Sequence, residues 1–325
     1  METERIPEYL AANVARAVAR LHALPVPPSF IFTTDFHAHD NSFVSAAVMK
    51  HLHAQTGVHR VFCGGDFPYA FGAPEDCVHD TERSLDYLET LKPELELYVA
   101  RGNHDITIRT SWTETTGYTH PEAETNRLLM SANSPAAECL AGDVCYYVDD
   151  PEQRVRYIVV NTSDSQSDDT AQYWGVHYSV GERQLRFLAE RALHFENGGA
   201  GWSVVVFGHV PCSRNIPDGE ACLAPLAELL AAFRNRRPHP YANFEHTQAE
   251  LAAYLCGHNH VDHAALDDGV LHVSSGAEAY YSDDVWARKP GTDTEILFDV
   301  CALDAQNRTL YMVRVGAGED RCLRY

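Results

Sequence analysis

Five short motifs along the chain combine aspartate, histidine and asparagine side chains that can bind a metal ion. They are Asp35-Phe36-His37, Gly65-Asp66, Gly102-Asn103-His104-Asp105, Gly208-His209 and Gly257-His258-Asn259-His260. Imidazole nitrogen and carboxylate oxygen suit Zn, Mn, Fe, Co and Ni, and the lack of thiolates in the motifs argues against a structural zinc site. Two carboxylates, four histidines and an amide oxygen are too many ligands for one ion. They fit two ions about 3.5–4 Å apart.

Each motif comes directly after an apolar segment rich in β-forming residues. These predicted strands cover residues 29–34, 58–63, 95–100, 203–207 and 252–256. In open α/β sheets, ligands bind at the carboxyl ends of the strands. We therefore expect the five motifs to converge on one surface, although they are far apart in sequence. In Asp35-x-His37 and His258-x-His260, alternate residues of extended chain point to the same side, so each pair can serve one ion or two neighbouring ions.

The rest of the chain alternates further predicted strands with predicted helices. Strands are expected at 155–161, 270–274, 296–302 and 310–315, the last two as a hairpin, and helices at 41–55, 80–91, 180–195 and 222–234. Continuous apolar runs such as VVVF indicate strands that are buried on both faces, so the pattern favours an α/β protein with covered sheets. Residues 106–143 interrupt this pattern and are expected to form an elaborated loop with one helix near 122–130.

The charge balance is strongly acidic, with 46 Asp and Glu against 25 Lys and Arg and a formal net charge of −21. Such a surface repels nucleic acid and anionic membranes at long range, although bound cations can dominate a local pocket. No segment has the apolar length needed to span a bilayer. The first 24 residues are predicted to form an amphipathic helix without a signal-peptide core, which favours a cytoplasmic protein whose nine cysteines are free thiols.

As a set, the motifs resemble those of the calcineurin-like metallophosphoesterase superfamily, which run in the order D-x-H, G-D, G-N-H-D, G-H and G-H-x-H. The resemblance extends from about residue 29 to residue 275. It implies a four-layer α/β/β/α sandwich with two central mixed β-sheets and a metal site at the carboxyl ends of the strands. It also implies one metal held by Asp35, His37, Asp66 and His260, and another held by Asp66, Asn103, His209 and His258. By the same resemblance, Asp66 bridges the two ions and His104 faces the substrate.

The implied chemistry is hydrolysis of a phosphoester. Two cations would acidify a water molecule between them, and the phosphate oxygens would bind the same cations. His104 would protonate the leaving oxygen or stabilise negative charge as imidazolium.

The chain departs from two branches of the superfamily after Asp66. The next residues are Phe67-Pro68-Tyr69, without the arginine of protein Ser/Thr phosphatases, which argues against a phosphoprotein substrate. The spacing of Asp66 and Tyr69 resembles purple acid phosphatases, whose tyrosine binds ferric iron. Those enzymes lack a histidine at the position of His37, so Tyr69 is predicted to be a pocket or core aromatic residue.

Several further side chains carry two interpretations each. His39 could touch phosphate or lie in a solvated loop, and Arg101 could bind an anion or form a surface salt bridge. Loop aromatics could stack on a flat substrate group or pack locally; they are Tyr173, Trp174, Tyr280 and Tyr281. Asp105 is expected to orient a neighbour, and His263 to lie behind the ligands or in solvent.

These observations lead to one set of predictions for the whole chain. Residues 1–28 form an N-terminal helical extension, and residues 29–325 form a single metallophosphoesterase domain with the elaborated loop at 106–143. The predicted activity is hydrolysis of a small-molecule phosphate monoester or diester with two Mn, Fe, Zn or Ni ions. The acidic surface disfavours nucleic acid as a partner, and no membrane partner is predicted. The alternatives are a nuclease or cyclic-nucleotide phosphodiesterase, and a non-catalytic binding scaffold. The sequence leaves the oligomeric state open.

Overall fold

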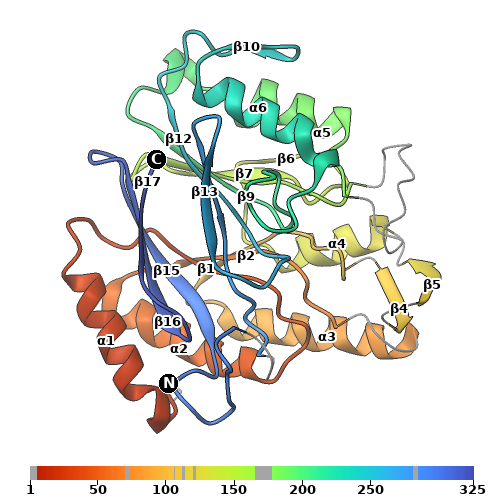
Figure 1. Cartoon of the computed structure of the whole chain (residues 1–325), viewed down its shortest axis with the longest axis vertical. Coiled ribbons are helices and arrows are strands. Elements are labelled where there is room, and N and C mark those ends of the chain that lie inside the picture. The colour runs from red at the N-terminus through yellow and green to blue at the C-terminus, as the bar shows by residue number, and fades with distance from the viewer. Residues whose placement is uncertain are drawn as a thin grey trace.

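Two mixed β-sheets pack face to face at the centre of the molecule (Figure 1). The computed structural model describes residues 6–69, 74–105, 107–111, 114–119, 122–164, 178–280 and 285–325. The first sheet has the strand order β17-β16-β15-β1-β2-β3. Its strands are β1 (Phe30–Thr33), β2 (Arg60–Cys63), β3 (Glu96–Val99), β15 (Leu297–Asp304), β16 (Thr309–Gly316) and β17 (Arg321–Arg324). Strands β1, β2 and β3 are parallel, and the other three form an antiparallel meander on β1.

The second sheet has the strand order β13-β14-β12-β9-β8-β7-β6. Its strands are β6 (Glu138–Cys139), β7 (Tyr146–Asp150), β8 (Val155–Val159), β9 (Ser203–Phe207), β12 (Glu250–Cys256), β13 (His263–Asp267) and β14 (Val270–Ser274). The four central strands β8, β9, β12 and β14 run parallel. Both sheets thus present a row of parallel strand ends, which is where the sequence predicted the metal ligands.

Helices cover the outer face of each sheet (Figure 1). They are α1 (Ala11–His22), α2 (Asn41–Thr56), α3 (Pro74–Leu91), α4 (Glu122–Ala132), α5 (Glu182–Phe187) and α6 (Ala224–Arg234). Helices α1, α2 and α3 lie on the first sheet, while α5 and α6 lie on the second. A π-helical segment, Leu188–Ala192, continues α5, and short 3-10 turns occur at Glu8–Leu10, Glu196–Gly199 and Ala221–Leu223. The predicted four-layer sandwich is confirmed.

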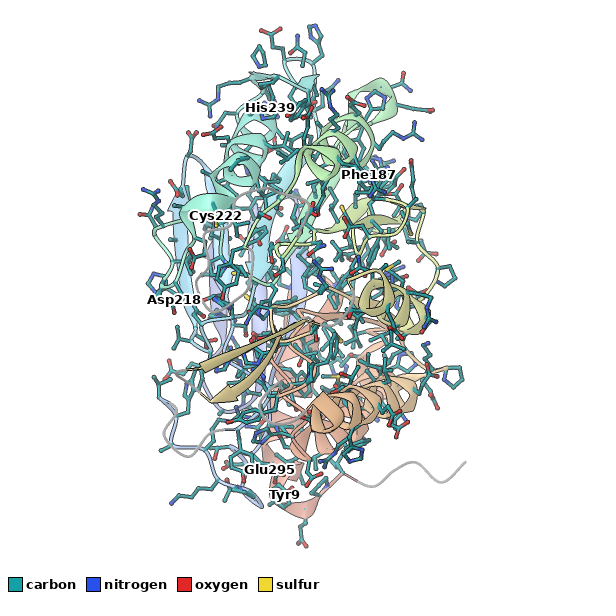
Figure 2. All side chains as sticks on the ribbon, turned by 90° about the vertical axis from the view of Figure 1, so that its right-hand side faces the viewer. Tyr9, Phe187, Asp218, Cys222, His239 and Glu295 are labelled. Carbon is teal, nitrogen blue, oxygen red and sulfur yellow. The ribbon has the colours of Figure 1, made fainter. Side chains whose placement is uncertain are left out.

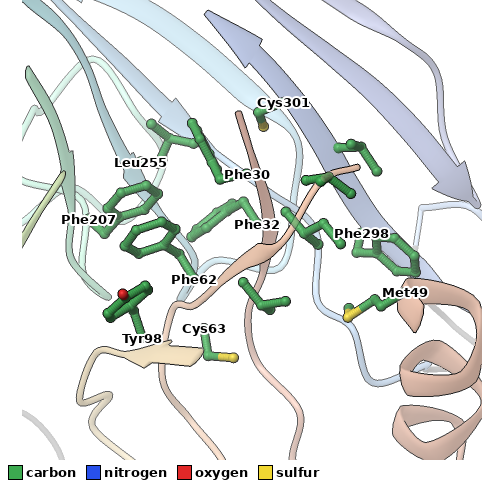
Figure 3. Close-up of a cluster of buried hydrophobic side chains, with 14 of the residues drawn as sticks. Phe30, Phe32, Met49, Phe62, Cys63, Tyr98, Phe207, Leu255, Phe298 and Cys301 are labelled. Carbon is green, nitrogen blue, oxygen red and sulfur yellow. The ribbon is translucent and has the colours of Figure 1, made fainter. Parts of the chain in front are cut away.

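An aromatic core fills the space between the two sheets (Figure 3). Phe30 and Phe62 come from the first sheet and Phe207 from the second, and all three rings are buried. The rings of Phe62 and Phe207 stack with their centroids 4.1 Å apart, and Phe30 meets Phe207 edge-on at 5.3 Å. Burying one such ring contributes roughly 1.5–3 kcal/mol, so this cluster holds the sheets together strongly. It also fixes the spacing between their strand ends.

The N-terminal helix packs on this framework through one apolar face. Leu10, Val14, Ala17 and Leu21 follow helical spacing, are buried, and belong to the same core cluster as the strands of the first sheet. Nearby, the hydroxyl of Tyr9 donates a 2.6 Å hydrogen bond to Glu295 Oε2 (Figure 2). The division into an extension at 1–28 and a domain at 29–325 stays a prediction.

The segment 106–143 contains more regular structure than the sequence indicated. A two-stranded hairpin, β4 (Thr107–Ser111) and β5 (Glu114–Thr119), precedes α4, and β6 follows it. The strand sequences TIRTS and ETTGYT lack an apolar alternation, so no strand pattern was visible. Within the described residues, β7, β13, β17 and the small pair β10 (Pro238–His239) and β11 (Ala242–Asn243) were also not predicted.

Buried Glu278 links the loop after β14 to the first turns of α2. Its carboxylate accepts hydrogen bonds from the hydroxyls of Ser42, at 2.6 Å, and Ser45. Its own N–H donates to the carbonyl of Thr34 at 2.7 Å, next to the first candidate ligand. Burial raises the pKa of Glu278 to about 7, because the charged form loses its hydration.

We predict that Glu278→Gln flattens the pH dependence of stability between about pH 4.5 and pH 7. In this window folded Glu278 keeps a proton that the unfolded chain has lost, so its contribution to the free energy of unfolding decreases as pH rises. The loss is on the order of 3 kcal/mol across the window. Glutamine keeps an oxygen for the serine hydroxyls but does not titrate. Urea unfolding of both proteins at several pH values measures the effect, and equal slopes would contradict it.

Candidate metal centre

The five motifs lie together at one edge of the sandwich, where β1, β2, β3, β9 and β12 end. All seven candidate ligands and His104 are in the described part of the chain. Five of the candidate ligands are buried and two are half-buried; the half-buried pair is His258 and His260. Their donor atoms form two neighbouring groups that share Asp66.

The first donor group consists of Asp35, His37 and His260. The Nε2 atoms of the two histidines are 3.2 Å apart. Asp35 Oδ1 lies 3.3 Å from Nε2 of His260 and 3.9 Å from Nε2 of His37. Three donor atoms from two separate strand ends therefore face a common point, a geometry that suits one cation.

The second donor group consists of Asn103, His209 and His258. Asn103 Oδ1 is 3.0 Å from His209 Nε2 and 2.9 Å from His258 Nδ1. Asp66 Oδ2 lies 3.1 Å from the same His209 nitrogen. These contacts come from the ends of β3, β9 and β12, and from β2 through Asp66.

One oxygen of Asp66 faces both groups. Oδ1 is occupied, because it accepts the backbone N–H of His104 at 2.8 Å. Oδ2 is 3.1 Å from His209 Nε2 and 4.0 Å from His37 Nε2, so it lies between the two sets of donors. This is the position that a bridging carboxylate would need.

The protonation of His209 tests whether a cation fits. Its Nδ1 lies 2.8 Å from the carbonyl of Gly64, which can only accept, so Nδ1 carries the hydrogen. In the neutral ring, Nε2 then points a lone pair at the oxygens of Asp66 and Asn103. Lone pairs facing lone pairs repel one another unless a proton or a metal ion lies between them. The donor set therefore fits a transition-metal cation.

Burial and charge act in opposite directions on the pKa values of the cluster. Burial lowers the pKa of His37 and of His258 to about 3, so both rings are neutral and can offer a lone pair at neutral pH. Burial alone would also lower the pKa of His209, but Asp66 and Asp35 raise it to about 9. In turn, His209 overrides the effect of burial and keeps the pKa of Asp66 well below its usual value. Without a cation, a proton on His209 offsets part of the charge of the two buried carboxylates.

The backbone at the ligands is strained. Five of the seven candidate ligands have positive φ values between 47° and 74°: Asp35, His37, Asp66, His258 and His260. Such conformations cost on the order of 1–3 kcal/mol each and persist only where the surroundings enforce them. These strained conformations occur together in one cluster of loops. This indicates that the surrounding structure, which sets the positions of the ligand side chains, outweighs the preference of the local backbone.

Two glycines allow the loops to approach the carboxylates. A Cβ atom at Gly102 would lie 2.1 Å from Asp66 Oδ1, and one at Gly257 would lie 2.1 Å from Asp35 Oδ2. No side chain fits at either position without moving a candidate ligand. Glycine is therefore needed at both positions, so that the loops can pack closely against the carboxylates of Asp66 and Asp35.

Asp105 joins the loop after β3 to the loop after β2. Its carboxylate accepts the backbone N–H groups of Gly102 at 2.6 Å, Phe67 at 2.9 Å and Asp66 at 3.2 Å. The sequence predicted that Asp105 orients a neighbour, and the structure shows that the neighbour is the backbone on both sides of the site.

His104 is oriented by a backbone carbonyl. Its Nδ1 donates to the carbonyl oxygen of Tyr69 at 2.8 Å, and its Nε2 lies 3.9 Å from Asp66 Oδ2. The ring of Tyr69 itself is edge-on to His37, with centroids 6.3 Å apart. Tyr69 thus contributes its carbonyl to the site and its ring to the wall beside it.

The remaining sequence interpretations have mixed outcomes. Arg101 is fully buried and donates hydrogen bonds to Asn126 Oδ1 at 2.6 Å and to the Ser163 carbonyl. The interpretation of Arg101 as part of a surface salt bridge is therefore wrong. His39 is half-buried and meets Tyr280 edge-on at 5.5 Å, and His263 is exposed on β13. Tyr173, Trp174 and Tyr281 lie outside the described residues.

Two contacts of the site were not predicted. Thr34 donates its hydroxyl to Asp35 Oδ2 at 2.7 Å, and the ring of Tyr178 meets His258 edge-on at 5.2 Å. Thr34 directly precedes the first motif, so its position was a usable signal. Tyr178 is far from every motif in sequence, and only the fold brings it to the site.

Comparisons with known proteins give a family and a fold. Residues 28–262 match the family model described as calcineurin-like phosphoesterase, and no curated protein sequence matches the chain. Among solved structures, GAP50, the anchor in the inner membrane complex of Plasmodium, is similar with a TM-score of 0.51 and 13% identity, over 91% of this chain and 87% of that one.

Two further similar structures have lower scores. The protein TT1561 of Thermus thermophilus has a TM-score of 0.47 and 12% identity, over 88% of this chain and 98% of that one. Phosphopantetheinyl hydrolase from Mycobacterium tuberculosis has a TM-score of 0.42 and 12% identity, over 78% of this chain and 91% of that one. At such identities, structural similarity bears on the fold alone.

We predict that Gly102→Ala lowers the affinity for metal by about 10-fold or more, because the new methyl group displaces Asp66. Gly57→Ala is the matched control: its Cβ meets nothing within 4 Å, but its φ of +78° makes alanine strained. The control should lose about 1–2 kcal/mol of stability and keep its metal affinity. Metal titration and thermal unfolding of both variants measure the two effects. Unchanged metal affinity in Gly102→Ala would contradict the prediction.

Proposed function

The chain belongs to the calcineurin-like phosphoesterase family and is a hydrolase of phosphoester bonds, and on this basis we propose that it cleaves a small phosphate monoester or diester at a dinuclear metal centre. One observation carries the proposal: Asp66 Oδ2 lies 3.1 Å from His209 Nε2 and 4.0 Å from His37 Nε2, so the same oxygen is near both groups of donor atoms. The first group, with Asp66, would hold one ion, and the second group, with Asp66, would hold the other.

The bound ions would be transition metals such as Mn, Fe, Zn or Ni, which accept imidazole and carboxylate ligands. They would supply an acidified water as nucleophile and offset the charge on the phosphate. The remaining contributions come from the chain itself. Neutral Asn103 is a weak ligand beside His209 and His258, so it leaves its side of the centre open to an anionic substrate.

We assign to His104 a role at the leaving group. The hydrogen bond to the Tyr69 carbonyl fixes a hydrogen on Nδ1, so Nε2 is the atom that can exchange a proton on the side of Asp66. When protonated, Nε2 donates to the leaving oxygen as the ester bond breaks, or stabilises the negative charge that develops there.

The net charge of −21 supports a small substrate over a polymeric one. A long polyanion would be repelled by the surface, whereas a single phosphate group reaches the cations locally. A nuclease or cyclic-nucleotide phosphodiesterase is the alternative within the same chemistry. A binding scaffold is the alternative outside it; the similar GAP50 is described as an anchor.

We predict that the purified protein binds two transition-metal ions and hydrolyses p-nitrophenyl phosphate or bis(p-nitrophenyl) phosphate. Asp66→Asn should lose both metal binding and turnover, because it weakens the ligand shared by the two groups. Elemental analysis and a phosphoester panel measure this, with oligonucleotides at several salt concentrations included. Degradation of oligonucleotides would favour the nuclease. Two bound ions without turnover of any ester would favour the scaffold.

We also predict that His104→Ala lowers kcat about 10²–10⁴-fold for alkyl esters and much less for p-nitrophenyl esters. An alkoxide needs a proton as it leaves, whereas p-nitrophenolate does not. The metal content should stay unchanged, since His104 belongs to neither donor group and alanine keeps the backbone N–H that donates to Asp66 Oδ1. A uniform loss across all leaving groups would assign His104 to charge stabilisation instead.

A further inference from the structure

A network of charged residues, of which Asp299 and Arg314 are fully buried, adjoins the loop that carries His260. Asp262, two residues after His260, accepts the backbone N–H of Gly276 at 3.0 Å with its Oδ1 atom. The same oxygen accepts a hydrogen bond from Arg314 Nη2 at 2.8 Å. Arg314 is fully buried on β16, in the first sheet, so a candidate ligand loop of the second sheet is tied to the first.

Two more charged residues complete the network. Asp299 on β15 is fully buried and accepts Arg314 Nε at 3.0 Å and Arg321 Nη2 at 2.6 Å. Arg321 on β17 also lies 3.5 Å from Asp262. Asp262, Asp299, Arg314 and Arg321 form a charge-balanced quartet, which satisfies the condition for burying ions at tolerable cost.

The quartet contacts the end of β14, which is in turn hydrogen-bonded to the end of β12. Arg321 Nη1 donates to the carbonyl of Ser274 at 2.8 Å, and the hydroxyl of Ser275 donates to Asp299 at 2.9 Å. The N–H of Ser275 donates to the carbonyl of Cys256, the last residue of β12, at 3.0 Å. The ends of β12 and β14 are therefore held against β15, β16 and β17.

This arrangement bears on the metal because the first donor group draws on both sheets. Asp35 and His37 follow β1 in the first sheet, whereas His260 follows β12 in the second. The fit of the three donor atoms depends on how the loop after β12 lies relative to β1. Asp262 ties that loop to Arg314 of the first sheet, in addition to the hydrogen bonds that the His258 N–H donates to Asp35.

We propose that the quartet of Asp262, Asp299, Arg314 and Arg321 positions His260, so that three residues C-terminal to the family match at 28–262 set the affinity of the first donor group for its ion. The proposal rests on the dinuclear centre proposed above. Asp262 is a positioning residue that acts through His260. Loss of comparable supporting contacts typically lowers metal affinity about 10–100-fold.

Calorimetric titration of the metal-free protein with Mn²⁺ tests the proposal without relying on activity. Asp262→Ala should weaken one of two binding steps about 10–100-fold and leave the other close to wild type. Asp262→Asn, which keeps an oxygen for Gly276 and Arg314, should recover much of the loss. Because Asp262 is partly exposed, the alanine variant is expected to fold. If it does not, Arg321→Gln carries the test with the same expected loss, because it removes the ion pair with Asp262 from the same quartet.

A double-mutant cycle separates positioning from general destabilisation. In a His260→Ala background, Asp262→Ala should not weaken Mn²⁺ binding further, because the residue through which it acts is absent. Asp149→Ala is the matched control: Asp149 accepts Arg156 Nε at 2.7 Å in another partly buried pair, on β7 and β8. It should lose stability and keep both affinities.

The outcomes distinguish this proposal from the proposed function. Wild-type protein that binds fewer than two ions of Mn²⁺, Fe²⁺, Zn²⁺ or Ni²⁺ would overturn the dinuclear centre itself. Two normal binding steps in both wild type and Asp262→Ala would overturn the positioning role alone. Equal weakening of both steps, or an additive effect with His260→Ala, would also overturn it.

Discussion

The structure depends on one electrostatic constraint: two buried carboxylates are held among four imidazoles, with Asp66 Oδ2 3.1 Å from one ring nitrogen and 4.0 Å from another. Asp35 and Asp66 are both fully enclosed, and an uncompensated buried charge costs several kcal/mol. Positive charge must therefore be present among them. A proton on His209, whose pKa Asp66 and Asp35 raise, would balance part of the negative charge. Metal ions balance it more completely, because each can face several donor atoms at once. We therefore expect folding and metal binding to be coupled.

The loops that carry the candidate ligands have strained backbone conformations, which keep these donor atoms in place. Positive φ values occur at Asp35, His37, Asp66, His258 and His260, where ordinary residues avoid them. The strain is offset by contacts that fix the backbone from behind, such as the three N–H groups on Asp105. Close packing of Gly102 and Gly257 against the carboxylates leaves little freedom to relax. The donors are consequently arranged before any ion arrives, and little reorganisation is needed on binding.

Much of the fold and of the candidate site could be predicted from the sequence, because each strand and the metal-binding motif at its end are neighbours in the sequence. The apolar runs at 203–207 and 270–274 coincide with β9 and β14, and each motif directly follows its strand. The contacts between distant segments could not be predicted. No sequence feature near Tyr178 indicates its contact with His258. The sequence around Arg101 is also compatible with an exposed side chain, and only the fold shows that it is buried. Strands β4 and β5 were missed because their threonine-rich sequences lack an apolar face. The division at residue 28 and the roles of the individual ligands stay predictions.

The position of the centre between two sheets explains why distant packing matters to it. Neither sheet supplies a complete donor set: β1, β2 and β3 bring Asp35, His37, Asp66 and Asn103, while β9 and β12 bring His209, His258 and His260. The distance between the two sheets therefore affects the distances between the donor atoms of the site. Stacked rings at Phe62 and Phe207 fix that spacing through dispersion and burial, which are short-ranged but insensitive to charge. The quartet around Arg314 fixes the relative position of the strand ends through directional hydrogen bonds. An apolar core alone would allow one sheet to slide slightly along the other. Such sliding would disturb a set of closely spaced donor atoms that come from both sheets.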